Sequence, residues 1–373
     1  MNTRPKQNAN SPSGSHLPSL DGLRAISIAL VFIGHVSGTR NLGPIAALSV
    51  LGNVGHFGVV IFFVISGFLI TRLLIQEHQR TGHVSLARFY ARRALRIFPA
   101  SYAYIGVIGM LSAFGIISLA RHDLIFSLAY LVNYKIDRSW FIGHLWSLSV
   151  EEQFYLLWPL TFKILGPKRW AWGSAAFVAL GPAARIFGWL VLRKTPYIDM
   201  EMFPMVADSL ATGCLLAALR GWLEKQALYL RLFHWLPSLV MVATVFALNR
   251  FMNYTVVNTL GFVIINVLLA VLIHRSVYCW RDAFGQFLNS KPVQSVGLLS
   301  YSLYLWQQPF LHKESLAWIA SFPQNLFLAI SAALLSYLLL EKPLLKLRGR
   351  LRAAPESAPA DNFAVARSFA AEI

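Results

Sequence analysis

Residues 59–70 read VVIFFVISGFLI, an uncharged and almost wholly apolar run. Similar runs recur at residues 26–35, 173–192, 256–272 and 317–340. The whole chain of 373 residues is 56% hydrophobic and only 13% charged, which is more apolar than a typical soluble domain. A helix needs about 20 apolar residues to cross a bilayer, and helices satisfy all their backbone polar groups internally. The sequence therefore predicts an all-α polytopic membrane protein.

Basic residues separate these runs, so we expect about ten transmembrane helices in a single bundle. Residues 124–132 form a further apolar piece that is too short to cross, and we expect it to be re-entrant or interfacial. The transmembrane domain is predicted at residues 20–348. The segments 1–19 and 349–373 are rich in small and polar residues and are expected to be disordered tails. The ten expected helices lie near residues 22–38, 54–75, 97–119, 145–165, 171–192, 203–220, 232–248, 255–274, 295–312 and 317–340.

A net charge of +17 is compatible either with nucleic-acid binding or with membrane topology. The distribution of the charge favours topology, because most of the 33 Lys and Arg residues fall on alternate connecting segments. This pattern predicts a multi-pass protein of the bacterial inner membrane with both termini in the cytoplasm, and no nucleic-acid partner. Neither Cys214 nor Cys279 has a plausible disulfide partner, and the sequence predicts no metal site.

Ionisable residues inside apolar helices mark functional sites by default. Arg24 and His35 lie three turns apart on one face of the first helix, about 16 Å along its axis. On the expected topology His35 lies near the external end, as do Glu151, Arg185 and Asp208 on three other helices. Four helices are thus expected to bring polar groups to one level.

Neutral imidazole is well suited to accept a proton near pH 7, so His35 is the candidate general base for a hydroxyl nucleophile. A carboxylate, that of Glu151 or of Asp208, is expected to fix the tautomer of the His35 ring. A structural interhelical hydrogen bond is the alternative reading of His35. For Asp208 and Arg185, a structural ion pair is as good a reading as a substrate-binding site.

The segment before the third apolar run is rich in arginine. As a helix it places Arg88, Arg92 and Arg96 on one face, a surface suited to the phosphates of a nucleotide. The alternative reading is a simple topology anchor, since basic residues flank most cytoplasmic helix ends.

Several motifs occur in a fixed order. Residues 20–25 read LDGLRA, residues 62–70 read FFVISGFLI, residues 89–99 read FYARRALRIFP, and residues 145–159 read LWSLSVEEQFYLLWP. Together these motifs resemble the acyltransferase 3 family, over roughly residues 17–348. The resemblance implies ten membrane helices and transfer of an acyl group, usually acetyl, from acyl-CoA to hydroxyls of glycans such as O-antigen, exopolysaccharide or lipo-oligosaccharide.

Carried over by position, the resemblance implies a catalytic role for Arg24, His35 and Glu151. It also implies that an arginine loop, which falls on Arg92, Arg93 and Arg96, binds the phosphates of acetyl-CoA.

One departure from the family concerns Gln307: many members carry a histidine after Leu-Tyr-Leu-Trp, and this chain has Gln307 there, followed by Gln308. An amide cannot shuttle protons, so Gln307 is expected to bind substrate by hydrogen bonds, together with Arg185 and Asp208. Ser66 is a weaker candidate for a covalent nucleophile. Larger relatives carry a fused extracytoplasmic domain, so we expect this chain to act alone or with an unlinked partner.

The expected function is therefore an integral membrane O-acyltransferase that moves an acyl group, most simply acetyl, from cytoplasmic acyl-CoA to a hydroxyl of a glycan or lipid-linked saccharide. The alternative is a transporter or flippase of a lipid-linked sugar, because polar groups inside a helical bundle also mark translocation paths.

Overall fold

The structure is a computed structural model that describes residues 17–43, 47, 54–191, 201–251, 260–313, 315 and 317–345. Nearly all of the two predicted tails, 1–19 and 349–373, lies outside these residues, as does the start of the helix expected at 255–274. Within the described part the chain is helical and forms no strand; one isolated bridge joins Arg40 to Ser321. Its elements are α1 (Pro18–Val36), α2 (Val54–Thr81), α3 (Leu86–Ala113), α4 (Asp123–Leu128), η2 (Val132–Tyr134), α5 (Trp140–Gly143), α6 (Leu145–Val191), α7 (Phe203–Leu223), α8 (Ala227–Arg231), α9 (Trp235–Phe251), α11 (Phe262–Tyr278), α12 (Ala283–Leu288), α13 (Lys291–Trp306), η4 (Trp318–Ala320), α14 (Gln324–Ser336) and η5 (Tyr337–Glu341).

In the described residues, six helices are long and apolar enough to span a bilayer: 18–36, 54–81, 86–113, 169–191, 203–223 and 324–345. Two shorter apolar helices lie at 235–248 and 262–278. The prediction of an all-α chain with several membrane helices is confirmed, whereas the number ten is not. The segment expected at 145–165 is helical but is not among these six, and the helix expected at 295–312 ends at Trp306.

One expected helix boundary differs in the structure and another is located by a glycine. The arginine segment and the third apolar run form one continuous helix, α3, which starts after Ser85, whose side chain accepts a hydrogen bond from the backbone of Arg88. The fourth and fifth expected helices, 145–165 and 171–192, are the two arms of α6, and the break between them falls at Gly166, where φ is 70°. Only glycine adopts this left-handed conformation without strain, so Gly166 sets the bend between the two arms.

Small residues bring the central helices close together. α2 packs against α7, and α1 packs against α2 and α13. A Cβ atom on Gly67 of α2 would lie 1.8 Å from the carbonyl oxygen of Leu210, and one on Gly213 of α7 would lie 2.0 Å from that of Val64. Membrane helices associate largely through such close contacts, because lipid provides no hydrophobic drive between them.

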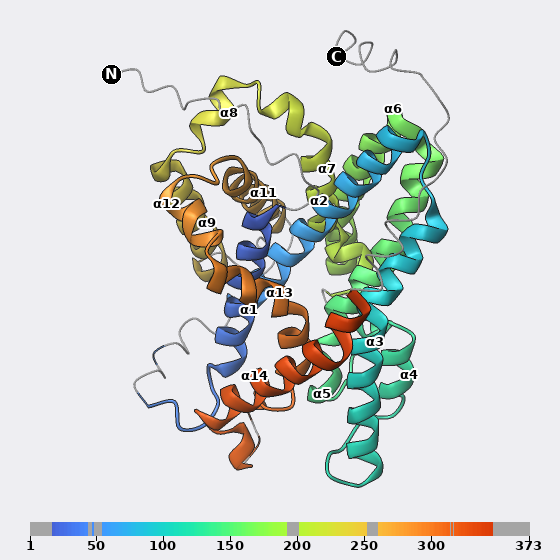
Figure 1. Cartoon of the computed structure of the whole chain (residues 1–373), viewed down its shortest axis with the longest axis vertical. Coiled ribbons are helices and arrows are strands. Elements are labelled where there is room, and N and C mark those ends of the chain that lie inside the picture. The colour runs from blue at the N-terminus through green and yellow to red at the C-terminus, as the bar shows by residue number, and fades with distance from the viewer. Residues whose placement is uncertain are drawn as a thin grey trace.

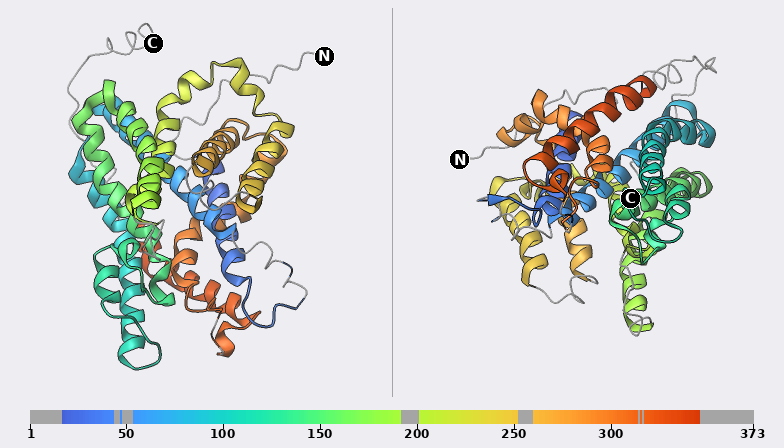
Figure 2. Two further views of the ribbon diagram at one scale, coloured as in Figure 1. Left: turned by 180° about the vertical axis from the view of Figure 1, so that it is seen from behind. Right: turned by 90° about the horizontal axis from the view of Figure 1, so that it is seen from below.

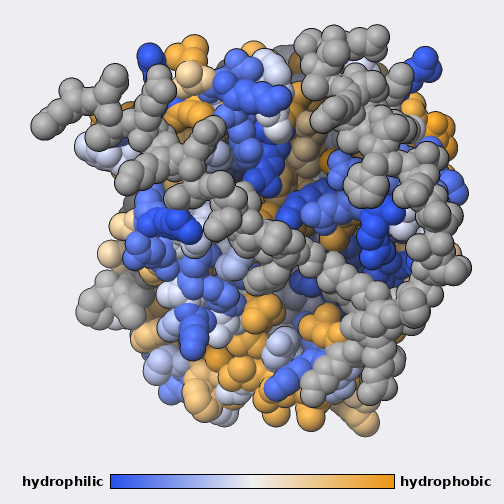
Figure 3. All heavy atoms as spheres, turned by 45° about the horizontal axis from the view of Figure 1, so that its top comes forward, coloured by the Kyte–Doolittle hydropathy of each residue, from blue (hydrophilic) through white to orange (hydrophobic). Residues whose placement is uncertain are grey.

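The two ends of the bundle differ in character. α8, α12 and the α2–α3 turn lie at one end in Figure 1, and α4 and α5 lie at the other; the view from behind in Figure 2 shows the same arrangement. α1 runs from the first end toward the second, so Arg24 lies nearer the first end and His35 nearer the second. Hydrophilic residues gather on the first end, which faces the viewer in Figure 3. The chain therefore places the side chains of Arg24 and His35 at different depths of one bundle.

Candidate active site

A cavity of about 390 Å³ opens at the first end, between α1, α2 and α3. Seven arginines and two carboxylates, those of Asp21 and Glu77, line it. Such an excess of positive charge in a concave site attracts polyanions, and guanidinium groups bind phosphates with two parallel hydrogen bonds. We call this site the arginine cavity; its arginines are Arg24, Arg72, Arg80, Arg88, Arg92, Arg93 and Arg96.

The predicted arginine face of α3 lines this cavity. Arg88, Arg92 and Arg96 follow one another at intervals of one helical turn, so all three point to one side. Glu77 holds Arg92 by an ion pair of 2.9 Å and accepts a hydrogen bond of 3.1 Å from the backbone of Ser85. Glu77 thus fixes the start of α3 to the end of α2.

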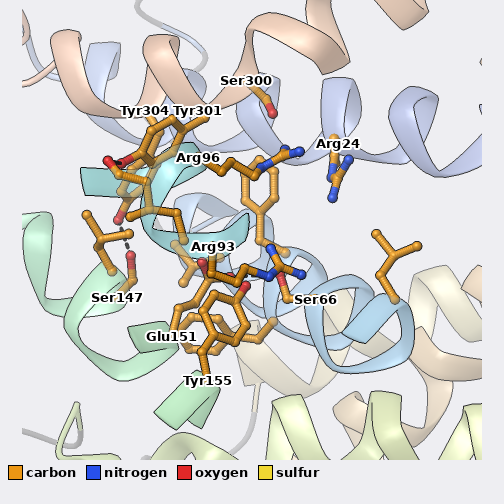
Figure 4. A pocket seen from close by; sticks show the side chains of 16 residues that line it. Arg24, Ser66, Arg93, Arg96, Ser147, Glu151, Tyr155, Ser300, Tyr301 and Tyr304 are labelled. Atoms are coloured by element: carbon orange, nitrogen blue, oxygen red, sulfur yellow. Dashed lines mark hydrogen bonds between the residues drawn. The ribbon is translucent and has the colours of Figure 1, made fainter. Parts of the chain in front are cut away.

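A second, smaller cavity of about 90 Å³ continues from the first toward the middle of the bundle. Arg24, Leu69, Arg93 and Arg96 line both, so the two spaces adjoin. We call this one the inner cavity. Figure 4 shows its polar side chains, which come from α1, α2, α3, α6 and α13. They are Arg24, Ser66, Arg93, Arg96, Ser147, Glu151, Tyr155, Ser300, Tyr301 and Tyr304.

Glu151 lies at the meeting point of the two cavities. The hydroxyl of Ser66 donates to Glu151 Oε1 over 2.8 Å, and the positive charges of Arg93 and Arg24 act on the same carboxylate. The guanidinium of Arg93 lies 4.6 Å from the ring centre of Tyr155, a cation–π contact that fixes its position. A carboxylate in this place balances part of the arginine charge deep in the bundle.

His35 lies beyond the inner cavity in different surroundings. Its ring centre is 5.7 Å from that of Trp140, and the amide of Gln307 lies beside it. His35 Nδ1 is buried without a hydrogen-bond partner, and both polar atoms of the Gln307 side chain likewise make no hydrogen bond of good geometry. The His35 ring is therefore available to take part in a proton transfer.

The expectation that Glu151 or Asp208 orients His35 is corrected by these contacts. Among the described residues, no hydrogen bond or ion pair joins His35 to either carboxylate. Glu151 is engaged at the level of Arg24, about three turns of α1 away from His35. The group beside the His35 ring is the Gln307 amide, so the four polar residues expected at one level occupy different places.

Arg185 and Asp208 pair with each other. Two guanidinium nitrogens of Arg185 contact the two carboxylate oxygens of Asp208 at 3.1 and 2.7 Å, and a third contact reaches the carbonyl of Met205. Both side chains are at most 2% exposed, and neither lines the arginine cavity or the inner cavity. This geometry favours the structural ion pair over the substrate-binding role.

Sequence reasoning missed several residues of these cavities. Arg72 and Arg80 of α2 face the arginine cavity two turns apart, and Tyr155 stacks on Arg93. The arginine spacing is visible in the sequence, but it could not be distinguished from a topology anchor without knowing that α2 and α3 face each other.

Several candidate spans, an arginine-lined cavity at one end and a histidine buried beyond it define a polytopic membrane protein with a polar path inside its bundle. Comparison with known proteins gives the family. Residues 17–341 match the acyltransferase 3 profile, described as an acyltransferase domain, and the chain belongs to that family. No solved structure matches it.

Similar curated proteins carry O-acetyltransferase names. The O-acetyltransferase OatA of Staphylococcus aureus strain NCTC 8325 is 29% identical over 333 residues, which cover 80% of this chain and 51% of the relative. The peptidoglycan O-acetyltransferase OatA of Listeria monocytogenes serovar 1/2a is 27% identical over 333 residues, 80% of this chain and 50% of the relative. The chain thus spans about half the length of these relatives.

Proposed function

We propose that this chain is a membrane O-acetyltransferase that transfers acetyl from acetyl-CoA to a hydroxyl of a cell-surface glycan. The observation that carries the proposal is the continuity of two cavities, one lined by seven arginines and the next leading from Arg24 toward the His35 region. The names of its relatives supply the reaction type, and the name of the Listeria relative points to peptidoglycan as one acceptor.

The arginine cavity suits the donor. CoA carries a diphosphate and a 3′-phosphate, and Arg92, Arg93 and Arg96 present guanidinium groups in the cavity from a single helix. Its pantetheine arm is long, thin and uncharged, so it fits the narrower inner cavity, which reaches Ser147 and Tyr304. Arg24, which lines both spaces, guides the arm from one to the other.

The transfer step uses His35 as general base. His35 takes the proton of the acceptor hydroxyl as the hydroxyl oxygen attacks the thioester carbonyl carbon. The carbon–sulfur bond then breaks, and the leaving thiolate of CoA receives that proton from the imidazolium. The products are the acetyl ester and CoA with a free thiol. The Gln307 amide beside the ring is placed to donate a hydrogen bond to the oxyanion that forms during the attack.

The orientation completes the proposal. The arginine end faces the cytoplasm of a bacterium, with both termini on that side. The His35 end faces the outer side of the inner membrane, and the bundle between the two ends has about ten helices. The density of arginines at the first end agrees with the positive-inside rule.

The test is acetyl transfer in sealed membrane vesicles. Inverted vesicles that contain the chain are given acetyl-CoA labelled in the acetyl group, and alkali-labile label is measured in glycan. We expect label with the wild type and a loss of at least tenfold with Arg92→Gln/Arg96→Gln. Arg231→Gln, an exposed residue of α8 at the same end, serves as the control. Right-side-out vesicles are expected to show no transfer.

Equal labelling by wild type and the double variant would reject the arginine cavity as the donor site. Absence of label from every glycan, with lipid-linked sugar still crossing the membrane, would favour a flippase instead.

A further inference from the structure

Polar atoms without partners gather around His35. In the part of the chain that the structure describes, eight buried side-chain nitrogens and oxygens of this region make no hydrogen bond. An orphaned buried polar atom costs about 1–3 kcal/mol, so proteins leave few of them. These atoms belong to His35, His144, Trp306, Gln307, Gln308 and His312.

Aromatic rings link these residues in two sets, one around Trp140 and one around Tyr104, and His35 of the first lies close enough to His144 of the second to interact electrostatically. We call the two sets together the His144 cluster. The Trp140 ring lies 5.7 Å from that of His35 and 5.3 Å from that of His312. The Tyr104 ring lies 5.3 Å from that of His144 and 5.4 Å from that of Trp306. The polar atoms thus alternate with flat apolar faces.

The cluster is rigidly built. Trp140 Nε1 donates to the carbonyl of Gln308 over 2.7 Å, and Gln308 Nε2 donates back to the carbonyl of Trp140 over 2.8 Å. This reciprocal pair fastens α5 to the turn after α13. It also leaves the carbonyl oxygen of the Gln308 side chain without a partner.

His144 lies where the cluster meets the inner cavity. It is 4% exposed, and neither ring nitrogen makes a hydrogen bond of good geometry, although the backbone of Leu305 lies beside the ring. Tyr304, which lines the inner cavity, donates its hydroxyl proton to the backbone carbonyl of His144 over 2.8 Å. The Tyr304 hydroxyl also lies 2.5 Å from Ser147 Oγ, as Figure 4 shows. The end of the proposed donor path therefore borders His144.

The chemistry of the cluster fits a sugar. Imidazole and amide groups both donate and accept hydrogen bonds, as sugar hydroxyls do, and aromatic faces pack against the apolar faces of a pyranose ring. The orphaned atoms belong to imidazole, amide and indole groups and to no carboxylate. A hydroxyl-rich ring satisfies such a set better than a cation does.

We propose that His144, with Gln307 and His35, forms the binding site for the acceptor sugar ring, in which His144 hydrogen-bonds a hydroxyl next to the one that is acylated. This proposal rests on the proposed acetyl transfer and adds its acceptor site. His144 is a positioning residue for the sugar, whereas His35 carries out the proton transfer.

The test measures saccharide binding without turnover. Purified protein in nanodiscs is heated with and without the GlcNAc–MurNAc disaccharide, and separately with 3′,5′-ADP as a probe of the arginine cavity. A ligand that binds only the folded state raises the unfolding temperature. We expect both probes to stabilise the wild type. His144→Phe retains ring packing against Tyr104 and Tyr304 but is expected to lose the disaccharide effect only.

Two further variants separate recognition from packing. His144→Gln restores an amide donor and acceptor and is expected to recover part of the disaccharide effect. His83→Phe, an exposed position, is the matched control. In the transfer assay, His144→Phe is expected to raise the KM for the disaccharide at least tenfold and to change kcat less.

The outcomes are distinct. Equal stabilisation of the wild type and His144→Phe by the disaccharide, or stabilisation of neither, overturns the acceptor site. Saccharide binding that depends on His144 but is accompanied by no acetyl transfer in the wild type would leave the site standing and reject the proposed reaction.

Discussion

His35 and Glu151 are both ionisable groups inside an apolar bundle, but their neighbours give them different capacities. His35 has an unpartnered ring nitrogen and an amide beside it, whereas Glu151 accepts a hydrogen bond from Ser66 and faces arginine charges. The first arrangement suits a group that must change its protonation during a reaction. The second fixes the Glu151 side chain in place between Ser66 and the arginines.

Replacement of the proposed base tests this difference. His35→Gln retains a polar side chain but cannot accept and return a proton, so we expect kcat to fall about 10²- to 10⁴-fold with little change in the KM for acetyl-CoA. Labelled acetyl transfer in vesicles measures both parameters, with His83→Gln as the control. Retention of more than a tenth of the wild-type kcat would contradict the assignment.

Ser66 provides a second test at the same scale. If Ser66 only supports Glu151, Ser66→Ala leaves a buried carboxyl oxygen without its hydrogen bond, which costs about 1–3 kcal/mol, and activity falls about 10- to 100-fold. Residual activity in this variant, together with no labelled acyl-enzyme in the wild type, is the expected result. Complete loss, with acetyl trapped on Ser66 of the wild type, would identify a covalent nucleophile.

The sequence indicated Arg24, His35 and the arginines of α3, because ionisable residues are conspicuous among apolar ones. It could not indicate their partners. Glu151 was expected beside His35, and only the packing of α6 against the other helices places it beside Ser66 instead. His144 was overlooked because a histidine at the start of a helix carries no pattern of its own.

At the scale of helices, the α2–α7 contact depends on two glycines. A methyl group on Gly67 would lie 1.8 Å from a carbonyl oxygen of α7, so the helices must move apart. We expect Gly67→Ala to destabilise the fold by about 3 kcal/mol or more. Gly106 of α3 has open space around it, and Gly106→Ala is expected to be neutral or stabilising. Thermal unfolding in detergent measures both; equal stability of the two variants would contradict the packing argument.

The Arg185–Asp208 pair joins α6 to α7 through charge, so its single and double variants are expected to differ in stability. Removal of one partner leaves a buried charge, so we expect Arg185→Met to cost about 3–5 kcal/mol. The double variant Arg185→Met/Asp208→Leu removes both charges and is expected to regain most of this stability. Transfer assays on the folded double variant then decide its role: near-normal kinetics fit a structural pair, whereas a raised acceptor KM would restore the substrate-binding reading.

Helix positions were predictable because apolar runs are long and well separated. Their ends and continuity were less so. α3 extends through the arginine segment because arginine is a good helix former and Ser85 caps the start. Between the fourth and fifth expected helices, the position of the break at Gly166 depends on the conformational freedom of that glycine. Composition alone does not resolve these local choices.

At the scale of the whole molecule, the described cavities reach inward from the arginine end, and the His35 region lies beyond them. Five helices contribute residues along this path: α1, α2, α3, α6 and α13. Of these, α6 lines it at helical spacing with Ser147, Glu151 and Tyr155. Such a stripe is recognisable in a sequence only once the facing helices are known.

The arginines of the inner cavity lie on α1 and α3, two helices long and apolar enough to span a bilayer. On the proposed topology they lie within the electric field of an energised membrane. If the donor enters from the cytoplasm, its phosphates move outward, in the direction in which an inside-negative potential drives anions. One charge that crosses about a tenth of a 100 mV drop gains roughly 0.2 kcal/mol, and CoA carries several charges. Donor capture should therefore be voltage-dependent: the KM for acetyl-CoA is expected to rise when an ionophore collapses the potential of respiring inverted vesicles. A KM that does not change with voltage would place the phosphates outside the field. A KM that does change would mean that acetylation at the cell surface depends on the energy state of the cell through this cavity.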